Sequence, residues 1–272
     1  MLSDITLGQY FPGNSIIHRF DARFKIIAIV LFIVGIFSAN SLAAYAGVVL
    51  QTVLIVALSR LNVKMIVRSL KPILFILAFT VVANLLLTKG EKPLVDIGFV
   101  EIYPEGILYA FLMALRIVCL IVGTFVLLTY TTTPVSLTDA IERLLSPFAK
   151  IGLPVHEFSM MMTIALRFIP TLIDETSKII NAQTARGADF SSGSLISRAK
   201  ALIPILIPLF ISAFRRADEL ATAMECRCYT GGEGRTRMKQ MKFGLKDIGA
   251  LAFYAVSFTA VILLNKYFGA LI

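Results

Sequence analysis

The stretch Phe24-Lys-Ile-Ile-Ala-Ile-Val-Leu-Phe-Ile-Val-Gly-Ile-Phe-Ser-Ala39 contains a single charged residue, Lys25, and that residue lies at its edge. A hydrocarbon core about 30 Å thick is crossed by a helix of roughly 17–25 apolar residues. The whole chain of 272 residues is similarly apolar: 57% of its residues are hydrophobic, 16% are charged, and the mean hydropathy is +0.83. Ordinary soluble domains are roughly 45–50% apolar. The sequence therefore predicts an all-α, polytopic membrane protein.

The distribution of positive charge predicts the orientation of the spans, because Lys and Arg accumulate in cytoplasmic loops. Arg19, Arg23 and Lys25 precede the first span, and residues 60–71 hold four more cations, whereas residues 38–41 carry no charge. The N-terminus is therefore expected inside and the C-terminus outside. The five expected spans are about Phe24–Ala39, Leu42–Leu58, Pro72–Thr88, Ile107–Tyr130 and Ile248–Phe268.

Two further apolar runs, Val155–Ile173 and Ala201–Phe214, are not expected to cross the membrane. The segments before, between and after them are all basic, so all three favour the cytoplasmic side. Each run continues into a polar stretch, which predicts two long helices, His156–Arg186 and Ile196–Arg227, each roughly 46–48 Å long. We therefore divide the chain into transmembrane helices over residues 1–131, a cytoplasmic helical region over 132–246 and a C-terminal span over 247–272.

The two long helices are expected to cross each other. Small side chains recur at helical spacing near the end of the second helix and would let another helix approach closely, with the first helix as the expected partner. A shorter amphipathic helix, about Ser136–Lys150, leads into the pair. The small-residue stripe consists of Ala213, Ala217, Leu220, Ala221, Met224 and Cys228.

Several functional classes lack the residues that they need. Gly231, Gly232 and Gly234 are followed by Arg235 and not by the Lys-Ser/Thr of a phosphate-binding loop, so the chain itself is not expected to bind ATP. Three cysteines and two histidines lack metal-site spacing, so we expect no metal and no cofactor. The net charge of +9 is explained by cytoplasmic loops without a nucleic-acid partner. The chain is predicted not to be an enzyme.

Ionisable side chains within spans often mark carriers and channels. The candidates are Arg116 in the fourth span and Arg167 in the first long helix, and no Asp or Glu lies within the spans to relay protons. For Arg116 we favour a structural charge that pairs inside the bundle. A self-contained secondary transporter or channel is the alternative to a non-enzymatic scaffold.

A short pattern recurs near the end of each long helix: Ala182-Gln-Thr-Ala-Arg186-Gly187 and, 41 residues later, Ala223-Met-Glu-Cys-Arg227-Cys228. An arginine in the last turn can simply complement the helix dipole. Two such arginines between small neighbours favour docking, because a guanidinium binds carboxylates and backbone carbonyls of a partner. The predicted docking residues are Ala185, Arg186, Gly187, Cys226, Arg227 and Cys228.

At these residues the sequence resembles the transmembrane coupling subunit, or T component, of energy-coupling factor (ECF) transporters, which are ABC-type importers of vitamins and metals. That family has two long cytoplasmic coupling helices, each ending in Ala-Arg-Gly or a near variant. The similarity extends through Leu166–Glu175 and Phe214–Glu225. The early segment His18–Lys25 also resembles the family, with Ala22 where a proline is common. Because Cys228 replaces the final glycine, it is not expected to act as a glycine cap.

The resemblance implies a complex in the prokaryotic cell membrane, formed with two ABC-type ATPases, which bind the ATP, and a small substrate-binding membrane subunit. Arg186 and Arg227 would each sit in a groove of one ATPase, and closure of the ATPase pair would move the coupling helices and tilt the substrate subunit on them. The substrate subunit would select the vitamin or metal. The residues proposed to contact it, for each of which core packing is the alternative, are Phe158, Met160, Met161, Met162, Ile203, Leu206 and Leu209.

Overall fold

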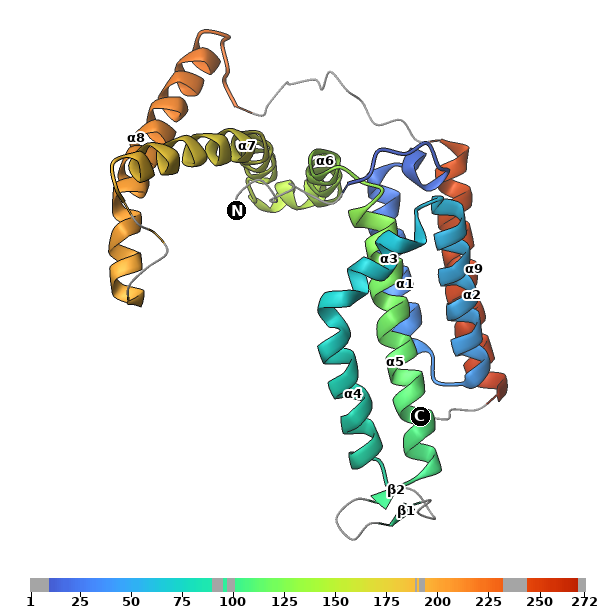
Figure 1. Cartoon of the computed structure of the whole chain (residues 1–272). Coiled ribbons are helices and arrows are strands. Elements are labelled where there is room, and N and C mark those ends of the chain that lie inside the picture. The colour runs from blue at the N-terminus through green and yellow to red at the C-terminus, as the bar shows by residue number, and fades with distance from the viewer. Residues whose placement is uncertain are drawn as a thin grey trace. The chain divides into compact units, whose positions relative to one another are not determined.

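The computed structural model describes residues 10–89, 95–96, 101–188, 190, 194–231 and 244–268. The chain divides into two compact units. One, called the bundle, covers Gln9–Thr133 and Met241–Ile272, and the other, called the long-helix unit, covers Pro134–Gln240. Both units are helical (Figure 1). The predicted all-α fold is confirmed, with one addition: a two-residue antiparallel pair, β1 (Val95–Asp96) and β2 (Glu101–Ile102).

The bundle is formed by five long apolar helices. Helices α1 (Ala22–Ser38), α2 (Leu42–Ser59), α5 (Pro104–Thr124) and α9 (Leu245–Phe268) pack side by side, and α4 (Leu74–Leu87) packs on α5 (Figure 1). Within the described residues, four stretches are long and apolar enough to cross a membrane, and α1, with 17 residues, is at the low end of the length that spans require. These four stretches are Leu42–Ser59, Val63–Leu87, Pro104–Thr129 and Asp247–Tyr267.

A short helix directly precedes the third span. Helix α3 (Val63–Leu70) and a 3-10 turn, Lys71–Ile73, lead directly into α4, so helical structure precedes the expected start at Pro72. Proline is tolerated there because it lies in the first turn of the new segment, where its missing N–H loses no hydrogen bond. The side chain of Asn62 accepts a hydrogen bond from the Lys64 N–H and caps α3.

Helix α5 is fixed to its neighbours by a glycine and an arginine. Gly123 lies so close to α1 that a Cβ on it would stand 2.1 Å from the ring of Phe32. Arg116 donates a hydrogen bond to the Ala39 carbonyl at 2.6 Å, and its guanidinium stacks 5.2 Å from the ring centroid of Tyr45. Arg116 thus closes the turn between α1 and α2, which confirms the structural role favoured for it.

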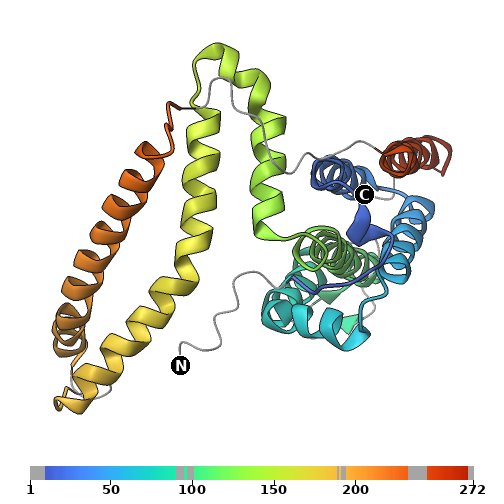
Figure 2. The same cartoon turned by 90° about the horizontal axis from the view of Figure 1, so that it is seen from above.

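The long-helix unit contains α6 (Pro134–Leu145), a 3-10 segment (Ser146–Ile151), α7 (Val155–Ala185) and α8 (Leu195–Glu225). The predicted long helices are confirmed to within one or two residues at each end, and neither is among the four candidate spans. Helix α7 packs against α6 and α8, and α7 and α8 cross as expected (Figure 1). Figure 2 shows that α7, which contains Pro170, bends along its length.

Candidate functional site

Helix α7 ends in a motif that fixes the backbone around Arg186. The N–H of Gly187 bonds to the Thr184 carbonyl at 3.0 Å, and the N–H of Ala188 bonds to the Gln183 carbonyl at 3.0 Å. Gly187 has a φ of 86°, in the left-handed region. This combination is the Schellman motif, and it places Arg186 at the last position before the chain turns away from the helix.

Helix α8 ends in the same motif without a glycine. The N–H of Cys228 bonds to the Glu225 carbonyl at 2.9 Å, and the N–H of Tyr229 bonds to the Met224 carbonyl at 3.1 Å. Cys228 has a φ of 56° and occupies the position that Gly187 occupies on α7. The expectation that Cys228 could not replace a glycine cap is therefore wrong, because closing the helix end outweighs the unfavourable left-handed conformation of its backbone.

Arg186 and Arg227 consequently occupy equivalent backbone positions, each one residue before the left-handed residue. Both side chains are exposed, and neither forms a hydrogen bond or ion pair with any residue in the described parts of the chain. The flanking Ala185, Gly187, Cys226 and Cys228 are exposed too. Each helix thus presents a guanidinium with small neighbours, able to donate several hydrogen bonds to a carboxylate or to carbonyl oxygens.

The apolar side chains proposed as one surface belong to different parts of the long-helix unit. Met160 lines a hollow with Arg227 and Cys228 at the end of α8. Phe158 and Met162 instead line a smaller pocket between α6 and α7. Met161 is exposed on α7, Ile203 and Leu206 are exposed on α8, and Leu209 is half-buried there. The geometry therefore places Met160 beside the second arginine, a proximity that no local sequence pattern predicts.

The exposed apolar side of α8 extends beyond the residues that were predicted to contact the substrate subunit. Ile203, Ile207, Phe210 and Phe214 follow helical spacing on its exposed side, and the rings of Phe210 and Phe214 stack at 6.4 Å. Phe210 and Phe214 are 62% and 68% exposed. A stripe of this kind within one helix marks a surface that can bind an apolar partner.

Glu175 is a residue of the site that the sequence analysis did not single out. On α7 it accepts a hydrogen bond from the Ser212 hydroxyl of α8, and its second oxygen lies 3.2 Å from the Arg216 guanidinium. Ser212 and Arg216 are four residues apart and so share one face of α8. The Ser212 hydrogen bond, and after it the charge of Arg216, lowers the pKa of the Glu175 carboxyl. These contacts fasten the crossing of the two helices.

Known proteins resemble this chain in sequence along nearly its whole length. Residues 13–238 match the CbiQ family, described as cobalt transport protein. The energy-coupling factor transporter transmembrane protein EcfT of Ruminiclostridium cellulolyticum is 55% identical over 268 residues, which cover 98% of this chain and 100% of the relative. The EcfT protein of Bacillus subtilis is 46% identical over 251 residues, which cover 92% and 94%. This chain belongs to the CbiQ family. It is the transmembrane T component of an ECF transporter.

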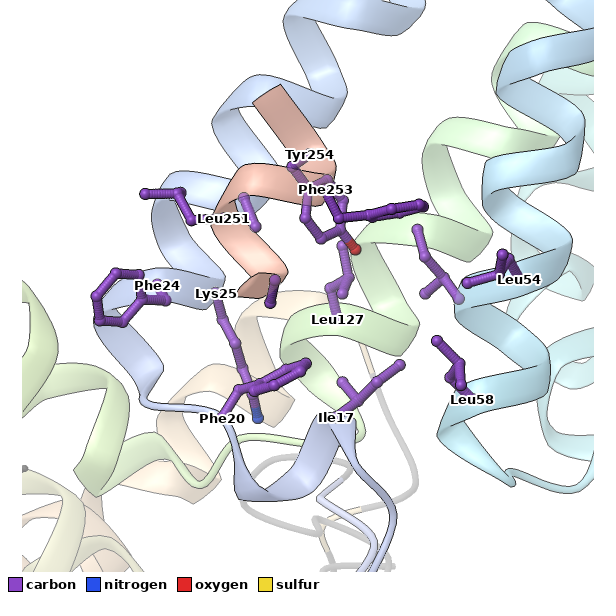
Figure 3. A pocket seen from close by; sticks show the side chains of 13 residues that line it. Ile17, Phe20, Phe24, Lys25, Leu54, Leu58, Leu127, Leu251, Phe253 and Tyr254 are labelled. Atoms are coloured by element: carbon purple, nitrogen blue, oxygen red, sulfur yellow. The ribbon is translucent and has the colours of Figure 1, made fainter. Parts of the chain in front are cut away.

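The bundle of this T component contains an almost entirely apolar pocket of about 190 Å³. Figure 3 shows Phe24 and the stem of Lys25 on α1, Leu58 on α2 and Tyr254 on α9 around it. A site for a polar vitamin or a metal ion needs several converging polar groups. Within the described residues, no group of three or more His, Cys, Asp or Glu side chains could hold a metal ion.

Proposed function

We propose that this T component links ATP hydrolysis by two ABC-type ATPase subunits to movement of a small substrate-binding membrane subunit, and so drives uptake of a vitamin or another micronutrient. The observation that carries the proposal is the equivalence of Arg186 and Arg227: the same backbone position, the same exposure and no partner among the described residues. Two equivalent docking points suit two related partner subunits, one for each arginine.

The remaining parts of the proposal follow from chemistry and charge. ATP is bound by the partner subunits, since this sequence has no phosphate-binding loop. The exposed stripe of α8, which includes Ile203, and the neighbouring exposed Leu206 receive the substrate subunit. The protein lies in the cell membrane of a prokaryote, with its N-terminus and long-helix unit in the cytoplasm and its C-terminus outside.

Removal of both arginines tests the docking. An interface arginine that fills a partner groove contributes about 2 kcal/mol or more to binding, so Arg186→Ala/Arg227→Ala should lose both ATPase subunits during purification while the bundle still folds. Co-purification from native membranes and ATP-dependent uptake are the measurements. A double variant that retains the ATPases and transports at the wild-type rate would contradict the docking.

A matched control removes two other exposed cations from the same helices. Lys178 on α7 and Arg215 on α8 are exposed and have no ion pair among the described residues, so Lys178→Ala/Arg215→Ala should keep the ATPases bound. The same purification separates this proposal from the alternative function. A self-contained secondary transporter would be isolated without ATPases and would transport without ATP.

A further inference from the structure

The first turn of α1 has contacts that the proposed function does not use. Lys25 is 3% exposed, and its ammonium donates to the Thr131 carbonyl at 2.8 Å and to the hydroxyls of Thr131 and Thr132 at 3.1 Å each. All three of its donors are therefore satisfied.

The residues that Lys25 holds are the last of the bundle before the chain enters the long-helix unit. The boundary between the two units falls between Thr133 and Pro134, and Pro134 is already the first residue of α6. Thr131 and Thr132 are themselves buried, and the Thr131 hydroxyl also donates to the Leu127 carbonyl at 2.8 Å. Only Thr133 lies between this fixed segment and α6.

The first turn of α1 also contacts the start of α9, with which the chain re-enters the bundle after the long-helix unit. The Asp247 carboxylate, in the first turn of α9, accepts the Asp21 N–H and the Gly244 N–H, both at 3.0 Å. Asp247 is buried. Both passages of the chain between the units are thus tied to one helical turn. We name Asp21, Lys25, Thr131, Thr132 and Asp247 the α1 clasp.

We propose that the α1 clasp is the anchor through which movement of the long-helix unit reaches the bundle, with Lys25 as its positioning residue. The inference rests on the proposed function. A displacement of α6 acts on the bundle first at Thr131 and Thr132, because only one residue intervenes. When these threonines are fixed, the displacement is passed on. When they are free, rotation about their backbone bonds absorbs it, and ATP is hydrolysed without transport.

Lys25→Met tests the anchor, because methionine keeps most of the apolar stem and removes the ammonium. Complexes purified with their ATPases are reconstituted into liposomes, and the cargo of the wild-type complex is identified with radiolabelled vitamins, cobalt and nickel ions. ATPase rate and uptake of that cargo are then measured together. The variant should hydrolyse ATP within about twofold of wild type but transport roughly tenfold less per ATP, a typical size for an energetic coupling between sites.

Milder variants keep the test decisive if Lys25→Met does not fold. Thr131→Val and Thr132→Val each remove one hydroxyl, and each should lower uptake per ATP, whereas Thr131→Ser should restore it. Lys71→Met makes the same change at an exposed lysine outside the clasp and should behave as wild type. Unchanged uptake per ATP in the clasp variants, or a parallel loss of ATPase activity and uptake, overturns the anchor. A wild-type chain that purifies without ATPases refutes the proposed function instead.

Discussion

Gly187 and Cys228 occupy the same left-handed backbone position, but only Cys228 carries a Cβ. That Cβ is unfavourable by roughly 1–2 kcal/mol, while glycine loses roughly 0.5–1 kcal/mol more backbone freedom on folding. We therefore expect Cys228→Gly to stabilise the end of α8 by about 0.5–1 kcal/mol. Hydrogen exchange of the Cys228 and Tyr229 backbone N–H groups, which close the motif, should slow about two- to fivefold.

Two control substitutions near the same helix ends should lower stability, whereas Cys228→Gly should raise it. Gly187→Ala meets open space but keeps a φ of 86°, so backbone strain alone should loosen the end of α7. Cys226→Gly changes a residue before the left-handed position, where glycine is unfavourable. Equal exchange rates in Cys228→Gly and wild type would show that the left-handed cysteine is not strained.

Single residues also mark the limit of what could be predicted from sequence. Arg186 and Arg227 could be found because helix-ending signals are local, with small residues and an arginine in one turn. The partners of Lys25 are 106 and 107 positions away along the chain, and Glu175 meets Ser212 only because two helices cross. Hydrophobic periodicity predicts which face of a helix is apolar but contains no information about such pairings.

At the scale of elements, the crossing of α7 and α8 should respond to pH through Glu175. Its pKa is lowered in the folded protein, so its contribution is fully present above the unfolded value of about 4.3 and is lost as the pH falls through the folded value. At pH 7, Glu175→Gln should lower the free energy of unfolding by about 1 kcal/mol, a typical value for such partly exposed polar contacts. Thermal unfolding of both proteins should show this difference shrinking below about pH 4.3.

Glu219→Gln is the control for this element, because it makes the same change at an exposed carboxylate in the interior of α8, without an ion pair among the described residues. It should unfold like wild type at every pH. If the difference in stability between Glu175→Gln and wild type persists in acid, it does not arise from the ionised contact with Ser212 and Arg216. It would then reflect a change in packing that is independent of charge.

The elements themselves were predicted unevenly, for physical reasons. The predicted bounds of α7 and α8 lie close to the observed ones, because in each helix the same helical periodicity continues from the apolar run into the polar stretch. The apolar run predicted as the third span, Pro72–Thr88, matches α4, but the short helix α3 before it was not predicted, because its Lys64 and Arg68 indicated only a basic loop. The β1–β2 pair has two residues per strand, too short for any alternating pattern.

At the scale of the whole molecule, the number of membrane crossings decides whether the two ends of the chain lie on the same side of the membrane. Helix α1 is about 26 Å long from its 17 residues, and it packs against α9 and α5 as a member of the bundle. If α1 spans with the four longer stretches, the crossings are odd in number and the two ends lie on opposite sides. If it does not, both ends lie on the same side.

Cysteine labelling in intact cells distinguishes these arrangements. Cys119, Cys226 and Cys228 are first replaced by serine, and a single cysteine is then introduced at exposed Asn14 before α1 or at exposed Lys64 in α3. If α1 spans, a membrane-impermeant thiol reagent should label both variants only after permeabilisation, because α1 and α2 lie between the two positions and basic loops remain inside. Labelling of Asn14→Cys in intact cells, with Lys64→Cys labelled only after permeabilisation, would mean that α1 does not span.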